Sequence, residues 1–163
     1  MSITLTINDI PDYLKSSKLY ENIVSDESFE VPIEYYKKEI IINNLDDVVS
    51  YIKLFDYWMI TKIPKEFFKF IFDNKEVIDL HKLKNECEET GMQILPDLIN
   101  DIEIIVKSEN VCFILAAHGS FDAFKYAHEY YGSILNIWIC HNAANNGQFE
   151  ILKYAHEKGC PMN

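Results

Sequence analysis

Two groups of side chains in this sequence have the residue types of a catalytic or metal site. The first group, His118, Ser120 and Asp122, contains the functional groups of a Ser–His–Asp hydrolase triad. A triad is defined by its geometry in space, and three residues close together in one turn do not supply that geometry by themselves. No Gly-x-Ser-x-Gly elbow and no phosphate-binding loop accompanies them in the sequence. We therefore interpret them as turn positions and predict no catalytic residue.

The second group contains Cys140, His141, His156 and Cys160, whose side chains are of the types that bind zinc. His156 and Cys160 would share one face of a helix, but the sequence has no CxxC or HxxxH pair to support a site. The preferred interpretation is structural: the histidine hydrogen-bonds the local backbone, and the cysteine packs as a small apolar side chain. No metal and no cofactor is predicted. His128 and His156 are interpreted as a recurring structural position, with a pH-sensitive pair as the alternative.

Composition excludes several classes of partner. The formal net charge is −11 and arginine is absent, so the chain has no basic stripe that would bind nucleic acid or an anionic membrane surface. The N-terminus lacks a signal-peptide pattern, and no apolar run approaches the length of a membrane span. The four cysteines are not spaced as a disulfide framework, which predicts free thiols and a cytoplasmic protein.

A repeated segment is the strongest structural signal in the chain. Residues 121–129 align with residues 149–157 at an offset of 28 residues, and both contain the pentapeptide KYAHE. An alanine pair and a glycine recur upstream, namely Ala116, Ala117 and Gly119 in the first unit and Ala143, Ala144 and Gly147 in the second. In the second unit we expect helices over 137–144 and 148–157, with Gly147 in a left-handed conformation between them.

The second unit, ICHNAANNGQFEILKYAHEKGCP, resembles an ankyrin repeat. His141 matches the histidine of that family's TPLH motif, and Gly159 matches the glycine after its second helix. The wording KYAHE-x-GCP is closer still to the divergent ankyrin-like repeats of giant DNA viruses of amoebae. The Thr-Pro opening is missing, and the period is shorter than the usual 33 or so. The resemblance covers residues 108–163 and implies two helical hairpins, about 110–133 and 137–163, of a viral protein.

The repeat pattern also has a consequence for the ends of the array. One solenoid unit does not bury its apolar face alone, and about three are usually needed for stability. We therefore expect the N-terminal region to cap one end of the two hairpins. The other end is expected to be covered by a partner or by a further repeat.

Residues 1–107 have the pattern of an α+β domain. Alternating apolar residues predict strands at 3–7 and near 29–33, and Ile40-Ile41-Ile42 predicts another strand. Helices are expected over 11–24, 45–59, from Pro64 to about 72, over 77–90 and over 94–106. Asn44 is the predicted N-cap of the second of these helices. The apolar stripe of that helix is expected to comprise Leu45, Val48, Val49, Ile52, Phe55, Trp58 and Met59.

This order of elements resembles the BTB/POZ or Skp1-like fold. The matching segments are LKSS at 14–17, IIINNLDDVVSYIKLFDY at 40–57 and LHKLKNECEET at 80–90. The second strand of the family's opening hairpin and its buried His–Lys/Arg pair are not recognisable. The fold class we predict is therefore an α+β, BTB/Skp1-like domain at 1–107 followed by an α-helical, ankyrin-like solenoid at 108–163, mostly α overall.

These resemblances imply a non-enzymatic protein–protein interaction adaptor. The repeats would hold a target, and the N-terminal domain would form a homodimer or dock a cullin of a ubiquitin ligase of the host. The alternative is a plain binding scaffold unconnected with ubiquitin, and a small enzyme or zinc protein is the third possibility. Aromatic residues dominate interface energetics, so Phe70, Phe72, Tyr130 and Tyr131 are the predicted protein-binding residues.

Overall fold

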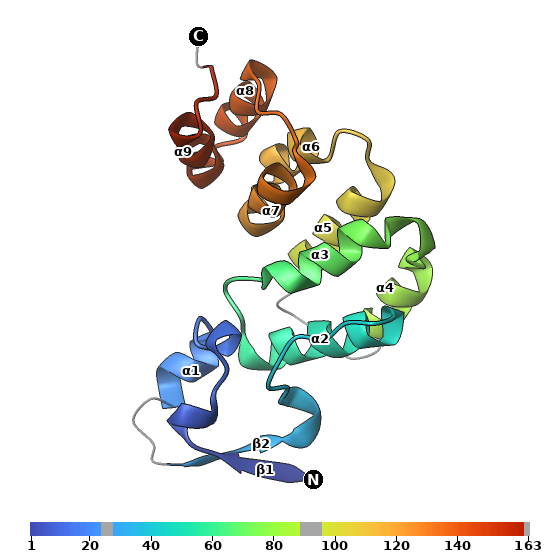
Figure 1. Ribbon diagram of the computed structural model, residues 1–163, viewed down its shortest axis with the longest axis vertical. Helices are drawn as coiled ribbons and strands as arrows, with labels where there is room; N and C mark the ends of the chain where they lie inside the picture. The colour runs from blue at the N-terminus through green and yellow to red at the C-terminus, as the bar shows by residue number, and fades with distance from the viewer. Residues whose placement is uncertain (24–27, 89–95, 162–163) are drawn as a thin grey trace. The chain divides into compact units, whose positions relative to one another are not determined.

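The computed structural model describes residues 1–23, 28–88 and 96–161 (Figure 1). The chain divides into two compact units. We call residues 1–70 with 77–96 the N-terminal unit, and residues 71–76 with 97–163 the hairpin unit. The domain boundary expected after residue 107 stays a prediction; the structure groups residues 97–107 with the helices that follow them.

The described residues are mostly helical and include one small antiparallel sheet, which agrees with the mostly helical fold class predicted. None of the helices in the described part of the chain is long and apolar enough to cross a membrane. The elements are β1 (Ser2–Leu5), α1 (Lys18–Ile23), β2 (Phe29–Pro32), α2 (Leu45–Trp58), α3 (Lys65–Asp73), α4 (Leu80–Glu88), α5 (Pro96–Lys107), α6 (Val111–His118), α7 (Phe121–Tyr131), α8 (Ile137–Asn145) and α9 (Phe149–Glu157). Short 3-10 helices lie at Ile7–Asp9, Asp12–Leu14, Ile33–Tyr35 and Lys75–Val77.

The sheet of the N-terminal unit consists of β1 and β2, in a register that places Leu5 opposite Phe29. β1 is shorter than the strand expected over 3–7. It ends at Leu5 because the backbone N–H and the hydroxyl of Thr6 both donate to the Asp9 carboxylate, at 2.8 and 2.7 Å. These bonds close a turn, and the chain leaves the sheet there.

Two predictions for this unit are wrong. Residues 40–42 do not form a strand, and a side chain of α2 bonds to the backbone at Ile41 and at the preceding Glu39. The N–H of Ile41 donates to the Tyr51 hydroxyl, which in turn donates to the carbonyl of Glu39, both at 2.9 Å. The helix expected over 11–24 is also interrupted, since buried Ser17 forms an isolated β-bridge with Ile60 and α1 begins only at Lys18. Residue 24 of that predicted helix lies outside the described residues.

The predictions for α2 and α3 are confirmed. The side chain of Asn44 accepts a hydrogen bond from the N–H of Asp47 at 2.9 Å, so Asn44 is the N-cap of α2. The helix ends at Met59, whose φ of 51° is left-handed. The predicted stripe is buried at Val48, Val49, Ile52, Phe55 and Trp58, whereas Leu45 and Met59 are only half-buried. α3 begins after Pro64 as expected and buries Phe67, Phe68 and Ile71.

The hairpin unit contains two consecutive helical hairpins, α6–α7 and α8–α9, that lie side by side (Figure 1). Gly119 and Gly147 follow α6 and α8 with φ of +84° and +70°, as predicted for Gly147. The observed bounds of α8 and α9 agree with the expected helices to within one residue. Of the three residues interpreted as turn positions, Ser120 lies in the loop between α6 and α7, whereas His118 is the last residue of α6 and Asp122 lies in the first turn of α7.

Candidate functional site

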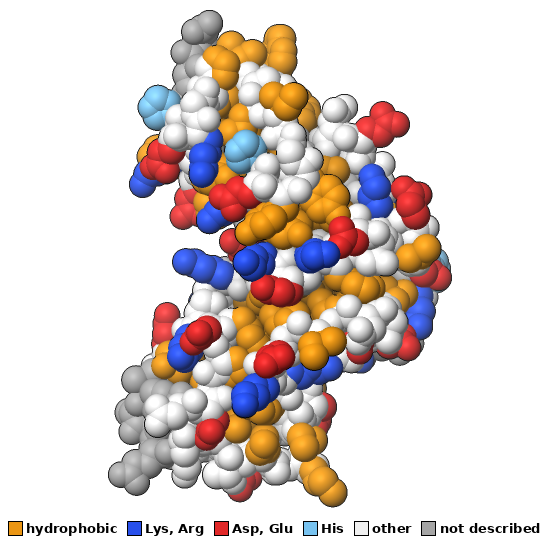
Figure 2. All heavy atoms as spheres, viewed as in Figure 1, with side chains coloured by type: hydrophobic (Ala, Val, Ile, Leu, Met, Phe, Trp, Pro, Cys, Tyr) orange, Lys and Arg blue, Asp and Glu red, His pale blue; other side chains and the backbone are white. Residues whose placement is uncertain are grey.

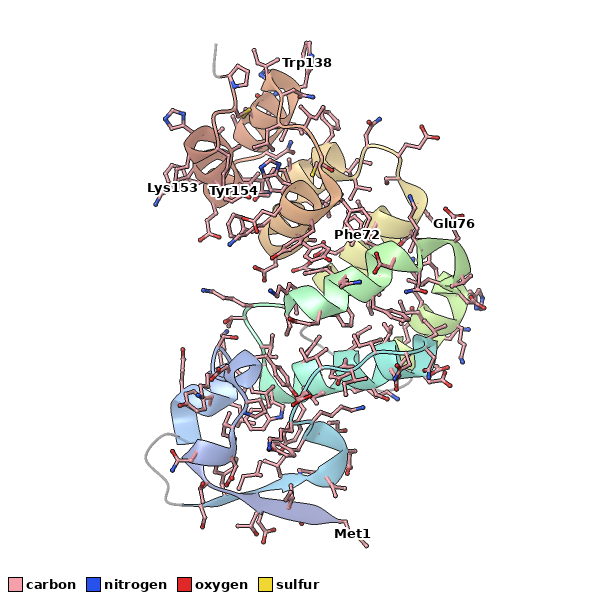
Figure 3. All side chains as sticks on the ribbon, viewed as in Figure 1. Met1, Phe72, Glu76, Trp138, Lys153 and Tyr154 are labelled. Carbon is pink, nitrogen blue, oxygen red and sulfur yellow. A yellow bond between two sulfur atoms is a disulfide. The ribbon has the colours of Figure 1, made fainter. Side chains whose placement is uncertain are left out.

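The recurring tyrosines of the KYAHE segments occupy corresponding positions in the two hairpins. Tyr126 of α7 and Tyr154 of α9 are both buried. The ring of Tyr126 lies 5.6 Å from that of Phe72, at the end of α3, and the ring of Tyr154 lies 6.1 Å from that of Phe124, in α7. Figure 3 shows Tyr154 directed from α9 toward α7. Each tyrosine therefore packs on an aromatic ring of a helix that precedes its own hairpin in the chain.

Polar side chains also connect the two hairpins. The amide of Gln148 donates to the carbonyl of Ala117 at 3.1 Å, and the amide of Asn142 donates to the carbonyl of Phe113 at 2.8 Å. The Gln148 amide lies directly over Gly119, where a Cβ would stand 2.2 Å from its oxygen. The bond to Ala117 satisfies a carbonyl in the last turn of α6, and the bond to Phe113 joins the second hairpin to the first turn of α6.

The three residues with triad chemistry are not assembled as a triad. The Ser120 hydroxyl donates to the carboxyl group of Asp101, and His118 Nδ1 lies 3.3 Å from the amide nitrogen of Asn100. Burial raises the pKa of Asp101 to about 7, although the hydrogen bond from Ser120 lowers it. Ser120 thus joins the first hairpin to α5, at the position that Gln148 occupies in the second hairpin.

The expectation that all four cysteines are free thiols is wrong. Cys140 and Cys160 form a disulfide that links α8 to the residues after α9, whereas Cys87 and Cys112 are free and buried. Sequence spacing did not indicate this pairing, because the fold of the hairpin and not a short spacing motif brings the two sulfurs together. The bonded sulfurs are not thiolates, so they do not supply the zinc ligands considered above. Within residues 1–23, 28–88 and 96–161, no three His, Cys, Asp or Glu side chains are grouped to hold a metal ion.

The histidines of the two hairpins differ in their surroundings. His128 Nδ1 lies 2.9 Å from the carbonyl of Ser133, and its ring meets the ring of Tyr154 edge to face at 5.8 Å. His156, at the corresponding place in α9, is exposed. At this recurring position, His128 has structural contacts because the second hairpin covers it, whereas His156 is exposed.

The predicted protein-binding aromatics have different environments. Phe72 is only 8% exposed and packs against Tyr126 and Tyr131, at 5.6 and 4.5 Å between ring centres, so little of its side chain is accessible to a partner. Phe70 is half-buried and belongs to the N-terminal unit. Tyr130 and Tyr131 are exposed at the end of α7, and the Tyr131 hydroxyl donates to Asp73. Only these two tyrosines present exposed surface of the kind predicted.

A groove that the sequence did not indicate lies where α6 and α8 begin. It encloses about 470 Å³ and has three exposed apolar side chains at its rim, Phe113, Ile134 and Trp138. Ile134 and Trp138 are 81% and 66% exposed. Figure 2 shows hydrophobic side chains gathered over α8, and Figure 3 shows Trp138 pointing away from the hairpins. We call these three residues and the cavity between them the α6–α8 groove.

The groove is rigid on one side and nearly uncharged. The Asn136 side chain accepts hydrogen bonds from the N–H groups of Trp138 and Ile139, at 3.0 and 3.1 Å, and so fixes the start of α8. Among the described residues that line the groove, Glu109 is the only acidic or basic one. Such an arrangement offers apolar contact and does not offer acid–base or metal chemistry.

Comparison of the chain with protein-family models, with curated proteins and with solved structures found no match.

Proposed function

We propose that this protein is a binding module that holds a segment of another polypeptide in the α6–α8 groove. The observation that supports the proposal is the exposure of Trp138 beside Ile134 and Phe113 around one cavity. Soluble proteins do not usually expose large apolar side chains next to one another unless these side chains contact a partner. Tryptophan in particular contributes a large contact area at interfaces.

The chemistry of the groove favours a peptide with apolar side chains over a charged ligand. Arginine is absent from the chain, and Glu109 at the rim repels anions. The mechanism we infer is docking without covalent chemistry, in which apolar side chains of the target fill the cavity. The two hairpins, which resemble ankyrin repeats, would hold the groove in position for the target.

The experiment is selection of peptides from a displayed library against the intact protein, followed by titration of single peptides. Trp138 is a direct reporter, since the other tryptophan, Trp58, is buried and donates to the Tyr35 carbonyl at 2.7 Å. We expect a blue shift of tryptophan emission on binding, and a loss of affinity of about tenfold or more in Trp138→Ala and Ile134→Ser.

The matched control is Val77→Ser, which removes an exposed apolar side chain far along the chain from the groove residues. Its affinity for the selected peptides should equal that of the wild type. Selected peptides whose affinity is the same for wild type, Trp138→Ala and Ile134→Ser would refute the groove as the binding site. A library that yields no binding peptide would also count against the proposal.

One further proposal concerns the N-terminal unit. Its order of strand, short helix, strand and long helix, as β1, α1, β2 and α2, supports the resemblance to BTB or Skp1-like domains. That resemblance implies an adaptor that brings the target of the hairpins to a cullin-type ubiquitin ligase. Co-purification with a cullin, or a homodimer formed through this unit, would support the adaptor, and failure of both would leave the binding scaffold alone.

A further inference from the structure

A second surface of the hairpin unit is the outward side of the last hairpin. Phe149 and Leu152 of α9, Gly147 of the loop, and Ala144 and Cys140 of α8 correspond to residues of the first hairpin that the second hairpin covers. The corresponding residues of the first hairpin are Phe121, Phe124, Gly119, Ala117 and Phe113. We call the five residues of the last hairpin the end face.

The covered counterpart shows which groups such a face accepts. On the first hairpin, the ring of Tyr154 meets the rings of Phe121 and Phe124 edge to face, at 5.7 and 6.1 Å. The Tyr154 hydroxyl donates to the Glu129 carboxylate at 3.1 Å. The amides of Gln148 and Asn142 reach the carbonyls of Ala117 and Phe113, as described above. One tyrosine and two side-chain amides therefore define this type of contact.

Phe149, Gly147 and Ala144 of the end face are exposed and Leu152 is half-buried, whereas Cys140 is buried. Phe149 is 74% exposed, whereas its counterpart Phe121 is half-buried. A Cβ on Gly147 would meet no atom within 4 Å, whereas one on Gly119 would collide with the Gln148 amide. A cavity of about 250 Å³, lined among others by Cys140, Ala144 and Leu152, opens on this face. The apolar contacts and the space are thus both available.

We propose that the end face binds a helical hairpin of a second polypeptide, one with a tyrosine in its second helix and an amide side chain in the loop before it. The tyrosine packs on Phe149 and Leu152, and its hydroxyl donates to Glu157, which corresponds to Glu129. The amide donates to the carbonyl of Ala144. This face continues the interface that already joins the two hairpins. Its cavity shares Trp138 with the α6–α8 groove, whereas Cys140, Ala144 and Leu152 line only the cavity of the end face among these two.

The occupant is not a hairpin of a second copy of this chain. The tyrosines that would make the contact, Tyr126 and Tyr154, are already buried against the preceding layer of their own molecule. A second copy would have to open its own hairpin unit to present one of them. A separate polypeptide with a free hairpin has no such cost.

The test uses the protein of residues 1–163 and, as a probe, a synthetic peptide of residues 136–161 closed by its own disulfide. The peptide contains Tyr154, Gln148 and Asn142, the three groups that cover the first hairpin. Titration of the isotope-labelled protein should shift amide resonances at the end face. Phe149→Asp in the protein, or Tyr154→Ala in the peptide, should weaken binding about tenfold or more. Phe149 is exposed, so its replacement is expected to leave the fold intact, which circular dichroism checks.

A tethered form guards against a peptide that is too unstructured to bind in solution. The same 136–161 segment is fused after Asn163 through a Gly/Ser linker, which raises its local concentration to the millimolar range. Hydrogen exchange should then slow across residues 149–152, and Tyr154→Ala in the added segment should abolish the slowing. No effect in either format overturns the proposal, as does a homodimer of the wild type that Phe149→Asp dissociates.

The control that separates this surface from the groove is Ile134→Ser. This substitution should weaken binding of the groove peptides and leave hairpin binding unchanged, because Ile134 lines the groove and does not line the cavity of the end face. Conversely, Phe149→Asp should leave the groove peptides unaffected. Loss of hairpin binding in Ile134→Ser would show that the end face is not a separate site and would overturn the proposal.

Discussion

Asp101 is a carboxyl group buried in the hairpin unit, where it accepts a hydrogen bond from Ser120. Burial is the largest cause that raises its pKa to about 7, and the nearby carboxylates Asp97 and Asp122 act in the same direction. The neutral form is therefore favoured in the folded state. The unfolded chain has the ordinary pKa, close to 4.

This difference predicts how stability depends on pH. A carboxyl whose pKa is raised on folding stabilises the protein fully below pH 4, and the stabilisation is lost as the pH rises through 7. Between pH 5.5 and pH 8 we expect Asp101 to contribute a loss of about 2 kcal/mol in the free energy of unfolding. Asp101→Asn, which cannot ionise, should remove this loss and be more stable than the wild type at pH 8.

Urea unfolding of wild type and Asp101→Asn at the two pH values measures the effect. Glu150→Gln is the control, because Glu150 is an exposed carboxyl of the hairpin unit that is not among the groups that raise the Asp101 pKa. It should follow the wild-type pH dependence closely. Parallel stability curves for wild type and Asp101→Asn would show that Asp101 is ionised in the folded protein.

Gly119 and Gly147 provide a second comparison between single residues. Both have positive φ, so alanine at either site costs about 1 kcal/mol in backbone strain. At Gly119 the new methyl group also displaces the Gln148 amide and breaks its bond to Ala117, whereas at Gly147 it meets nothing. Gly119→Ala should therefore lose about 1 kcal/mol more than Gly147→Ala in the free energy of unfolding.

The comparison is repeated in a Gln148→Ala background to isolate the contact. There the two alanine substitutions should have the same cost, since the amide is absent from both proteins. Equal costs already in the wild-type background would mean that Gln148 does not hold the two hairpins together.

At the level of elements, the Cys140–Cys160 disulfide ties the start of the last hairpin to its end. Without reductant, the denatured chain should react with two equivalents of an alkylating reagent, at Cys87 and Cys112, and with four after reduction. A bond that spans 20 residues restricts the unfolded chain enough to contribute about 3 kcal/mol to stability. Reduction should lower the free energy of unfolding by that amount.

Intact-mass measurement of the alkylated protein determines the cysteine state, and urea unfolding with and without reductant determines the stability. The control is the double variant Cys140→Ser and Cys160→Ser, whose stability should not respond to reductant. Four alkylated cysteines in the unreduced protein would contradict the assignment.

Elements whose signals are local were predictable from the sequence. α2 has its N-cap, its acidic first turn and its apolar stripe within 16 residues, and the hairpins repeat a local pattern of alanines, glycine and aromatics. Residues 40–42 have the composition of a strand, but the hydroxyl of Tyr51 takes the backbone bonds that a neighbouring strand would need. That competition depends on tertiary contacts and has no sequence signature.

The candidate site was harder to predict for the same reason. Phe72 has the aromatic side chain expected of a binding residue, but its burial by Tyr126 and Tyr131 depends on how a helix distant in sequence packs. Trp138 and Phe113 belong to corresponding ends of two hairpins, so their approach follows only once the hairpins lie side by side. One sequence signal does point to the groove: Trp138, at the start of α8, replaces the Val111 found at the corresponding position of the first unit.

At the scale of the whole hairpin unit, the two hairpins differ in how much of each is covered. The first hairpin has a neighbour on each side: its Tyr126 packs on Phe72 of α3, and its Phe124 packs on Tyr154 of the second hairpin. The second hairpin has a neighbour on one side only among the described residues, and its end face is exposed. In repeat proteins the stability of each unit is approximately the sum of its own stability and its contacts with neighbouring units.

Native-state hydrogen exchange should therefore show a gradient along the array. Amides of α9 should exchange faster than those of α7, because α9 opens when a single interface is lost, whereas α7 opens only when two are lost. Reduction of the Cys140–Cys160 disulfide removes the restraint on the last hairpin and should widen the difference between α7 and α9. Exchange measured by mass spectrometry on peptides 121–131 and 149–157 provides the comparison. If α7 and α9 exchanged at the same rate after reduction, the two hairpins would unfold as one cooperative unit. The exposed end face would then not make the last hairpin less stable than the first.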